Sequence, residues 1–116
     1  MAGKSGADIS AEDEVQVTYL RSKTGKRRTI PIWFTLNEGK MELLPMYGLR
    51  TKWFADVEKA GSLEVEVKGW RKEGNPQVIR DLKAVERIKQ RFAAKYGEGD
   101  VRRYYPNQDV ALELPL

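Results

Sequence analysis

The alternation of apolar and polar residues predicts β-strands along most of the chain. Residues 15–21 (VQVTYLR) place their apolar side chains on one face and their polar side chains on the other, as a half-buried strand does. The same alternation over residues 29–36 is the strongest strand signal, and it sets Trp33 opposite the Ile and Phe side chains. Pro31 cannot donate a ladder hydrogen bond, so this strand is expected at a sheet edge or a bulge. Further strands are predicted at residues 40–44, 63–67, 77–80 and 110–114.

Two stretches change to the helical period of three to four residues. The first begins after Thr51, a candidate N-cap, and Gly61 supplies its stop. The second follows a candidate N-cap at Asp81, runs to Tyr96 and ends at Gly97. Strands in meanders with interposed helices favour an antiparallel barrel with helices at its margins over a doubly wound sheet.

A chain of 116 residues is the size of one domain, and no internal repeat is visible. We expect a mainly β (α+β) domain over residues 15–116, a barrel of about six antiparallel strands with two helices. Residues 1–14 are small, polar and charged, which predicts a flexible N-terminal arm. No run is long enough to span a membrane and no signal-peptide core is present, so the expected location is cytoplasmic.

The chain contains no cysteine and no histidine. This excludes disulfides, thiolate metal sites, His-based triads and His-ligated zinc, so we expect no metal site. Any chemistry must come from carboxylates, hydroxyls, amines or a bound cofactor, and three Trp and five Tyr are available to stack on one. The net charge of +4 fits phosphate ligands and nucleic acid equally well.

The turn before the second predicted strand is a candidate phosphate site. Phosphate recognition requires cations, preferably arginine, and backbone N–H groups that can approach closely. The turn offers these groups in Lys23, Thr24, Gly25, Lys26, Arg27 and Arg28. The alternative interpretation is a basic hairpin that is simply solvated.

The start of the first predicted helix is a second candidate anion site. Arg50 and Lys52 flank Thr51, where the free N–H groups and the helix dipole are positive. Cations there oppose the dipole at a cost of about 0.3–1 kcal/mol, which a bound anion would remove. The alternative is that both cations point into water.

The aromatic residues allow several interpretations. Trp33 lies at the surface or in a pocket, while Trp53 falls on the apolar face of the first helix and is expected in the core. Trp70, Tyr104 and Tyr105 lie in irregular stretches, where exposed aromatic side chains mark an interface or a ligand lid.

Three runs of the sequence, KTGKRRTIPIWF, KWFADVEKAGSLEVEVKG and AAKYG, resemble the deazaflavin-dependent nitroreductase family. That family belongs to the flavin and deazaflavin oxidoreductases that share the pyridoxamine-phosphate-oxidase split barrel. The matching positions are Lys23-Thr24-Gly25, Arg28, Ile32-Trp33-Phe34 and Trp53. Asp56 and Val57 stand where Asn-Leu is common, and Gly61 stands where Pro is common.

The resemblance implies a split β-barrel of the FMN-binding type, usually a homodimer, with FMN or the deazaflavin coenzyme F-420 at the barrel edge. In such proteins the basic turn and the helix start hold the phosphate, and the third strand with the following loop lines the ring. The predicted phosphate contacts are Lys23, Thr24, Gly25, Lys26, Arg28, Thr51 and Lys52. The predicted ring contacts are Pro31, Trp33, Leu44, Pro45, Met46, Tyr47 and Gly48. Asp56 would repel phosphate if it faced the ligand.

The function that we expect is a flavin- or deazaflavin-dependent reductase that transfers a hydride to a small organic acceptor. Tyr47 is the candidate proton donor or substrate hydrogen bond. One alternative is a small basic barrel that binds nucleic acid, suggested by Arg102-Arg103-Tyr104-Tyr105, where aromatic and basic residues adjoin. Another is a dimeric barrel that has lost its cofactor.

Overall fold

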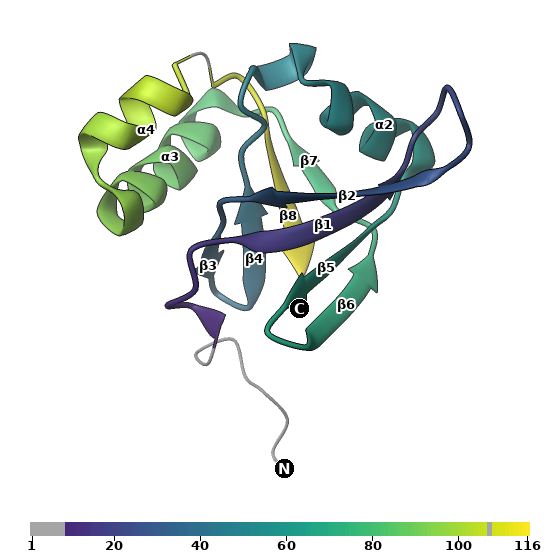
Figure 1. Cartoon of the computed structure of the whole chain (residues 1–116). Helices are drawn as coiled ribbons and strands as arrows, with labels where there is room; N and C mark the ends of the chain where they lie inside the picture. The colour runs from purple at the N-terminus through teal and green to yellow at the C-terminus, as the bar shows by residue number, and fades with distance from the viewer. Residues whose placement is uncertain (1–8, 107) are drawn as a thin grey trace.

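The computed structural model describes residues 9–106 and 108–116 as eight strands, three α-helices and one 3₁₀ turn (Figure 1). In chain order the elements are β1 (Val15–Leu20), β2 (Arg27–Ile32), β3 (Thr35–Asn37), β4 (Lys40–Leu43), η1 (Gly48–Arg50), α2 (Lys52–Ala60), β5 (Leu63–Val67), β6 (Trp70–Gly74), β7 (Gln77–Ile79), α3 (Leu82–Tyr96), α4 (Glu98–Tyr104) and β8 (Ala111–Pro115). The mixed α+β class is confirmed, but the described strands number eight instead of about six.

The strands form two antiparallel four-stranded sheets, with the order β2-β1-β5-β6 in one and β3-β4-β8-β7 in the other. β1 pairs with β2 from Val15 opposite Ile32 to Leu20 opposite Arg27. β2 therefore lies at an edge of its sheet, which confirms the prediction made from Pro31.

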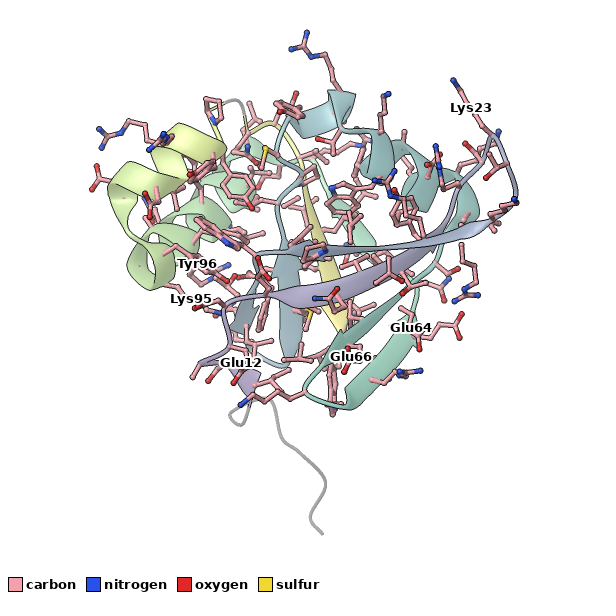
Figure 2. The ribbon with its side chains drawn as sticks, in the orientation of Figure 1. Glu12, Lys23, Glu64, Glu66, Lys95 and Tyr96 are labelled. Carbon is pink, nitrogen blue, oxygen red and sulfur yellow. The ribbon has the colours of Figure 1, made fainter. Side chains whose placement is uncertain are left out.

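The prediction of one strand over residues 29–36 is wrong, because the chain changes sheets at Trp33 and Phe34. Side chains of α3 satisfy the backbone at this point: Phe34 N donates to the Tyr96 hydroxyl at 3.0 Å, and Lys95 Nζ donates to Phe34 O at 2.9 Å. Figure 2 labels Lys95 and Tyr96, the last two residues of α3. Alternation continues through the break, so sequence periodicity does not reveal it.

Most of the core lies between the two sheets, and a second cluster lies under α3 and α4. The alternating residues of β1 and β5 face the first cluster, as their burial pattern requires. Of the predicted N-terminal arm, residues 1–8 lie outside the described residues, and its flexibility stays a prediction. Ile9, which belongs to the predicted arm of residues 1–14, is among the described residues and is buried in the first core cluster.

The two predicted helices are confirmed, with different caps. Asp81 accepts a hydrogen bond from Lys83 N at 3.4 Å at the start of α3, as an N-cap does. Thr51 occupies the N-cap position of α2, but its Oγ1 accepts from Tyr47 N at 2.9 Å instead of capping the helix. α4 was not predicted, and Trp70 begins a strand that was expected to be irregular.

An ion pair between buried Glu42 and part-buried Arg91 connects α3 with the second sheet. Glu42 of β4 has no exposed surface; it accepts from Arg91 Nε at 2.8 Å and from the Thr35 hydroxyl at 2.7 Å. The hydrogen bond to Glu42 raises the pKa of Arg91 above its ordinary value. These hydrogen bonds connect α3, the helix that ends in Tyr96, directly to β4.

Candidate functional site

A pocket of about 470 Å³ opens beside the free edge of β2, where that strand, the end of β4, the start of α2 and the end of α4 meet. Its lining is mostly apolar and aromatic. The lining residues are Glu14, Ile30, Pro31, Ile32, Trp33, Leu44, Met46, Tyr47, Thr51, Trp53, Tyr104 and Tyr105. We call this cavity the aromatic pocket.

One wall of the aromatic pocket is a set of interlocked rings. Trp33 stacks on Tyr96, with ring centroids 4.1 Å apart and planes 8° from parallel. Tyr104 meets Trp33 edge-on at 5.8 Å, and Tyr105 lies 5.9 Å from it. Tyr105 also packs edge-on against Phe92 of the second core cluster at 5.7 Å. The wall is therefore anchored in the core and presents a flat ring, Trp33, as pocket lining.

The loop after β4 forms the other side, and short-range hydrogen bonds shape it. Gly48 N donates to Pro45 O at 3.0 Å, and Leu49 N donates to Asp109 Oδ1 at 2.9 Å. The Tyr47 side chain is 62% exposed at the rim. A ligand in the pocket would lie between this loop and the aromatic wall.

The phenols of Tyr96 and Tyr105 stay protonated at neutral pH. Burial raises the pKa of Tyr96 to about 12, and burial also raises the pKa of Tyr105. The Tyr96 hydroxyl lies 2.9 Å from Phe34 O and 2.7 Å from Asp13 O, so its role is to hold the backbone beside Trp33.

A second cavity, of about 320 Å³, lies between the β1–β2 turn and α2. Its lining residues are Tyr19, Arg21, Ser22, Lys23, Arg28, Lys52, Ala55 and Asp56. Four of these are cations and one is a carboxylate, so we call it the basic cleft. Among the described residues, the ion pairs within 4 Å do not involve Lys23, Arg28 or Lys52. Lys23 lies at the outer tip of the turn (Figure 2).

The carboxylate of the basic cleft is bonded to the turn. Asp56 Oδ1 accepts from the Ser22 hydroxyl at 2.6 Å and from Ser22 N at 3.3 Å. The hydroxyl hydrogen bond lowers the pKa of Asp56 below its ordinary value, and Arg21 and Lys59 lower it further. Asp56 is therefore an anion that faces the predicted phosphate site and occupies two of its donors.

The two cavities adjoin along two elements. Ile30 lines the aromatic pocket and Arg28 lines the basic cleft; they lie on the same face of β2, about 7 Å apart along the strand. At the start of α2, Thr51 lines the pocket and Lys52 the cleft. One ligand with a flat ring and an anionic tail has the shape and polarity to lie across both.

The structure divides the predicted site residues among three locations. Six of them line the aromatic pocket, namely Pro31, Trp33, Leu44, Met46, Tyr47 and Thr51. Lys23, Arg28 and Lys52 line the basic cleft. The remaining five, Thr24, Gly25, Lys26, Pro45 and Gly48, belong to turns next to these cavities and are not among the lining residues; Thr24 Oγ1, for example, accepts from Lys26 N at 3.2 Å within the turn. Whether these residues bind a ligand stays a prediction.

Other lining residues were not predicted as part of the site. Trp53 was expected in the core, and it is both 8% exposed and part of the pocket lining. The sequence indicated Tyr104 and Tyr105 as a possible interface or ligand lid. The end of α4 and its C-cap bring both residues to the pocket. Nothing in the sequence indicated that Glu14 belongs to the site, because only the pairing of β1 with β2 brings it to the pocket.

No cluster of three or more candidate metal-ligating side chains occurs in residues 9–106 and 108–116. Within those same ranges, no helix combines the length and apolar character needed to cross a membrane.

Residues 7–110 match a protein family described as "Uncharacterized protein conserved in bacteria (DUF2255)". The chain belongs to this family. The match covers both cavities of the DUF2255 chain, with every lining residue inside it. No curated protein sequence matches the chain.

Solved structures of distant sequence share the fold of this DUF2255 chain. The F420-H2-dependent reductase FDR-A is 15% identical, with a TM-score of 0.68 over 89% of this chain and 94% of that one. A conserved hypothetical protein of Mycobacterium tuberculosis is 11% identical, with a TM-score of 0.74 over 96% of this chain and 79% of that one. HutZ, a heme storage protein of Vibrio cholerae, is 13% identical, with a TM-score of 0.69 over 93% of this chain and 84% of that one.

At these identities the likeness shows the fold alone. At that level, the resemblance to the deazaflavin-dependent reductases is confirmed.

Proposed function

We propose that the protein is a flavin-type oxidoreductase that binds a deazaflavin or flavin across the aromatic pocket and the basic cleft. The observation that carries this proposal is that lining residues of the two cavities are neighbours on β2 and at the start of α2, with an apolar, ring-lined space on one side and four cations on the other. The fold shared with an F420-H2-dependent reductase supports the deazaflavin, coenzyme F-420, over FMN.

The residues fit such a cofactor at both ends. Trp33, Pro31 and the 44–47 loop would flank its ring system, and Arg28, Lys23 and Lys52 would hold its phosphate. A bound flavin-type cofactor supplies hydride transfer. The chain's own residues orient the ring, exclude water and place polar groups beside it, which suits a protein without histidine or cysteine.

Tyr47 remains the proposed proton donor or substrate hydrogen bond, because it stands at the pocket rim with 62% of its surface exposed. The acceptor in this proposal is a small organic molecule of the nitro-compound type, reached through the same opening.

The two four-stranded sheets enclose one core, and we interpret this arrangement as a split β-barrel. We also propose a homodimer. Its support is a group of exposed apolar side chains at the aromatic pocket, namely the lining residues Met46, Tyr47 and Tyr104 together with the nearby Leu49.

Heme is the second ligand to test, because HutZ shares the fold. The chain has no histidine or cysteine to ligate iron, which leaves only methionine and tyrosine as side chains of a usual type. The nucleic-acid alternative rested on Arg102-Arg103-Tyr104-Tyr105. Of these residues, Tyr105 is buried and Arg102 forms an ion pair with Glu98.

The proposal is tested by visible absorption spectra of the purified protein, alone and titrated with F-420, FMN and hemin. A saturable shift of the F-420 or FMN spectrum, or a flavin-like band that co-elutes with the protein, is the expected result. A spectrum that responds only to hemin, or to none of the three, would contradict a flavin-type function. Retention of a labelled oligonucleotide would then test the nucleic-acid alternative.

A further inference from the structure

The basic cleft contains its own anion, and this feature bears on the kind of ligand tail that it accepts. Asp56 lies in α2 and faces the β1–β2 turn, where its Oδ1 receives both the hydroxyl and the amide hydrogen of Ser22. These two donors are the kind that a bound phosphate uses. The cleft thus offers its cations to a ligand, while part of its hydrogen-bonding capacity is already taken.

We propose that Asp56 determines the tail specificity of the cleft by disfavouring a doubly charged phosphomonoester more than a singly charged phosphodiester. This inference rests on the proposed function and identifies the chemical class of the cofactor tail. Among the two cofactors considered, FMN ends in a phosphomonoester, whereas the phosphate of F-420 is a phosphodiester with its carboxylates further along the tail. The comparison below concerns the phosphate group in the cleft.

Charge is the first reason. A tail held by Arg28 and Lys52 lies in the same cleft as the Asp56 carboxylate, so each negative charge on the tail is repelled by it. For unit charges about 5–6 Å apart in a water-exposed cleft, this repulsion corresponds to about a threefold loss of affinity per charge. A dianion therefore loses about tenfold and a monoanion about threefold.

Hydrogen bonding is the second reason. A terminal phosphomonoester presents three oxygens that require donors, whereas a phosphodiester presents two. Because Asp56 occupies the Ser22 hydroxyl and amide, the other side-chain donors that line the cleft are its lysines and arginines and the Tyr19 hydroxyl. The tail with fewer oxygens is satisfied more completely.

The test compares three ligands and four proteins at pH 8, where a phosphomonoester is a dianion. The ligands are F-420, FMN and riboflavin, which shares the FMN ring and lacks the phosphate. The proteins are wild type, Asp56→Asn, Ser22→Ala and Asp100→Asn. Asp100 is exposed on α4 outside both cavities, so Asp100→Asn makes the same change in net charge away from the cleft. Dissociation constants from absorption or fluorescence titration are the readout, with the melting temperature of each variant as a folding check.

We expect Asp56→Asn to strengthen FMN binding about tenfold and F-420 binding about threefold, with riboflavin unchanged. Ser22→Ala keeps the carboxylate and should leave the ratio of FMN to F-420 affinity within twofold of wild type, as should Asp100→Asn. If Asp56→Asn unfolds, Asp56→Ser gives the same comparison, because it also removes the charge.

Two results would overturn the inference, and they have different consequences. In the first, wild type binds F-420 or FMN, but Asp56→Asn does not change the ratio of the two affinities, or Asp100→Asn changes it by the same amount. The proposed role of Asp56 is then wrong, and the proposed function stands. If none of the ligands binds to any of the four proteins, the role of Asp56 and the proposed function are both wrong.

Discussion

The aromatic pocket and the basic cleft are lined by neighbouring residues of β2 and α2, but the protein builds them in opposite ways. The wall of the pocket continues into the core through Tyr105 and Phe92, and the Trp33–Tyr96 stack fixes its surface. The cleft is lined mostly by polar side chains of the ends of β1 and β2, the turn between them and the start of α2, with Asp56 bonded across it to Ser22. A rigid wall determines where a ring lies, whereas mobile cations supply attraction with little geometric demand.

This comparison predicts that changes in the pocket affect stability and ring binding together, whereas changes in the cleft affect only the binding of charged tails. The tests below run from the largest expected effect to the smallest.

Trp33→Ala should lower the free energy of unfolding by about 2–4 kcal/mol, since it removes a large ring that stacks on Tyr96. Riboflavin binding should be lost as well, because the flat wall is gone. Urea denaturation and riboflavin titration measure the two effects. Full stability in this variant would show that the wall is not anchored as described.

Arg28→Ala should weaken binding of FMN or F-420 by about 1–3 kcal/mol, the range for charge-assisted hydrogen bonds. Riboflavin affinity and the melting temperature should not change, because Arg28 is exposed and no ion pair within 4 Å involves it among the described residues. Arg87→Ala, at an exposed position of α3 that lines neither cavity, is the matched control. An equal loss of riboflavin affinity would place Arg28 at the ring instead of the tail.

Tyr96→Phe should lower stability by about 1–2 kcal/mol at pH 7, because Phe34 loses its hydrogen-bond partner at the sheet crossover. The folded pKa of Tyr96, about 12, lies above its ordinary value of 10, so the folded state retains a proton that the unfolded chain releases. The contribution is therefore complete below pH 10 and is lost as the pH rises from 10 to 12. Stability measured across that window should fall less steeply in Tyr96→Phe than in wild type; equal slopes would contradict this role.

Tyr47→Phe should change stability by less than about 0.5 kcal/mol, since the side chain is 62% exposed. Its effect should appear in turnover of a nitro-aromatic acceptor with the cofactor bound, and not in cofactor affinity. Unchanged turnover over pH 6–9 would remove Tyr47 from the chemistry and leave proton delivery to solvent.

Local sequence patterns predicted the strands and helices in which buried residues recur at a single regular spacing and in which a cap or stop residue marks an end. β1, α2 and α3 are of this kind, with Gly61 and Asp81 marking boundaries. The crossover at Phe34 was not predictable, because the groups that satisfy its backbone come from α3, about 60 residues later.

The candidate site divides in the same way. Its charged part is visible in the sequence because the cations cluster within the β1–β2 turn. The aromatic part is assembled from β2, the loop after β4, α2 and α4, and only the fold brings Trp33 and Tyr105 together. The bond between Asp56 and Ser22 also spans 34 positions, so the sequence shows a carboxylate in an unusual place but not what it contacts.

Pro31 has a consequence for how copies of the protein can associate. An exposed outer strand with a complete row of amides is a template for joining sheets between molecules, and it leads to aggregation. β2 lacks one amide at Pro31 and carries the positive charges of Arg27 and Arg28, so a second strand would find a missing donor and like-charge repulsion. In the homodimer that we propose, we therefore expect side-chain contacts at the pocket rim to join the subunits, with no sheet shared between them.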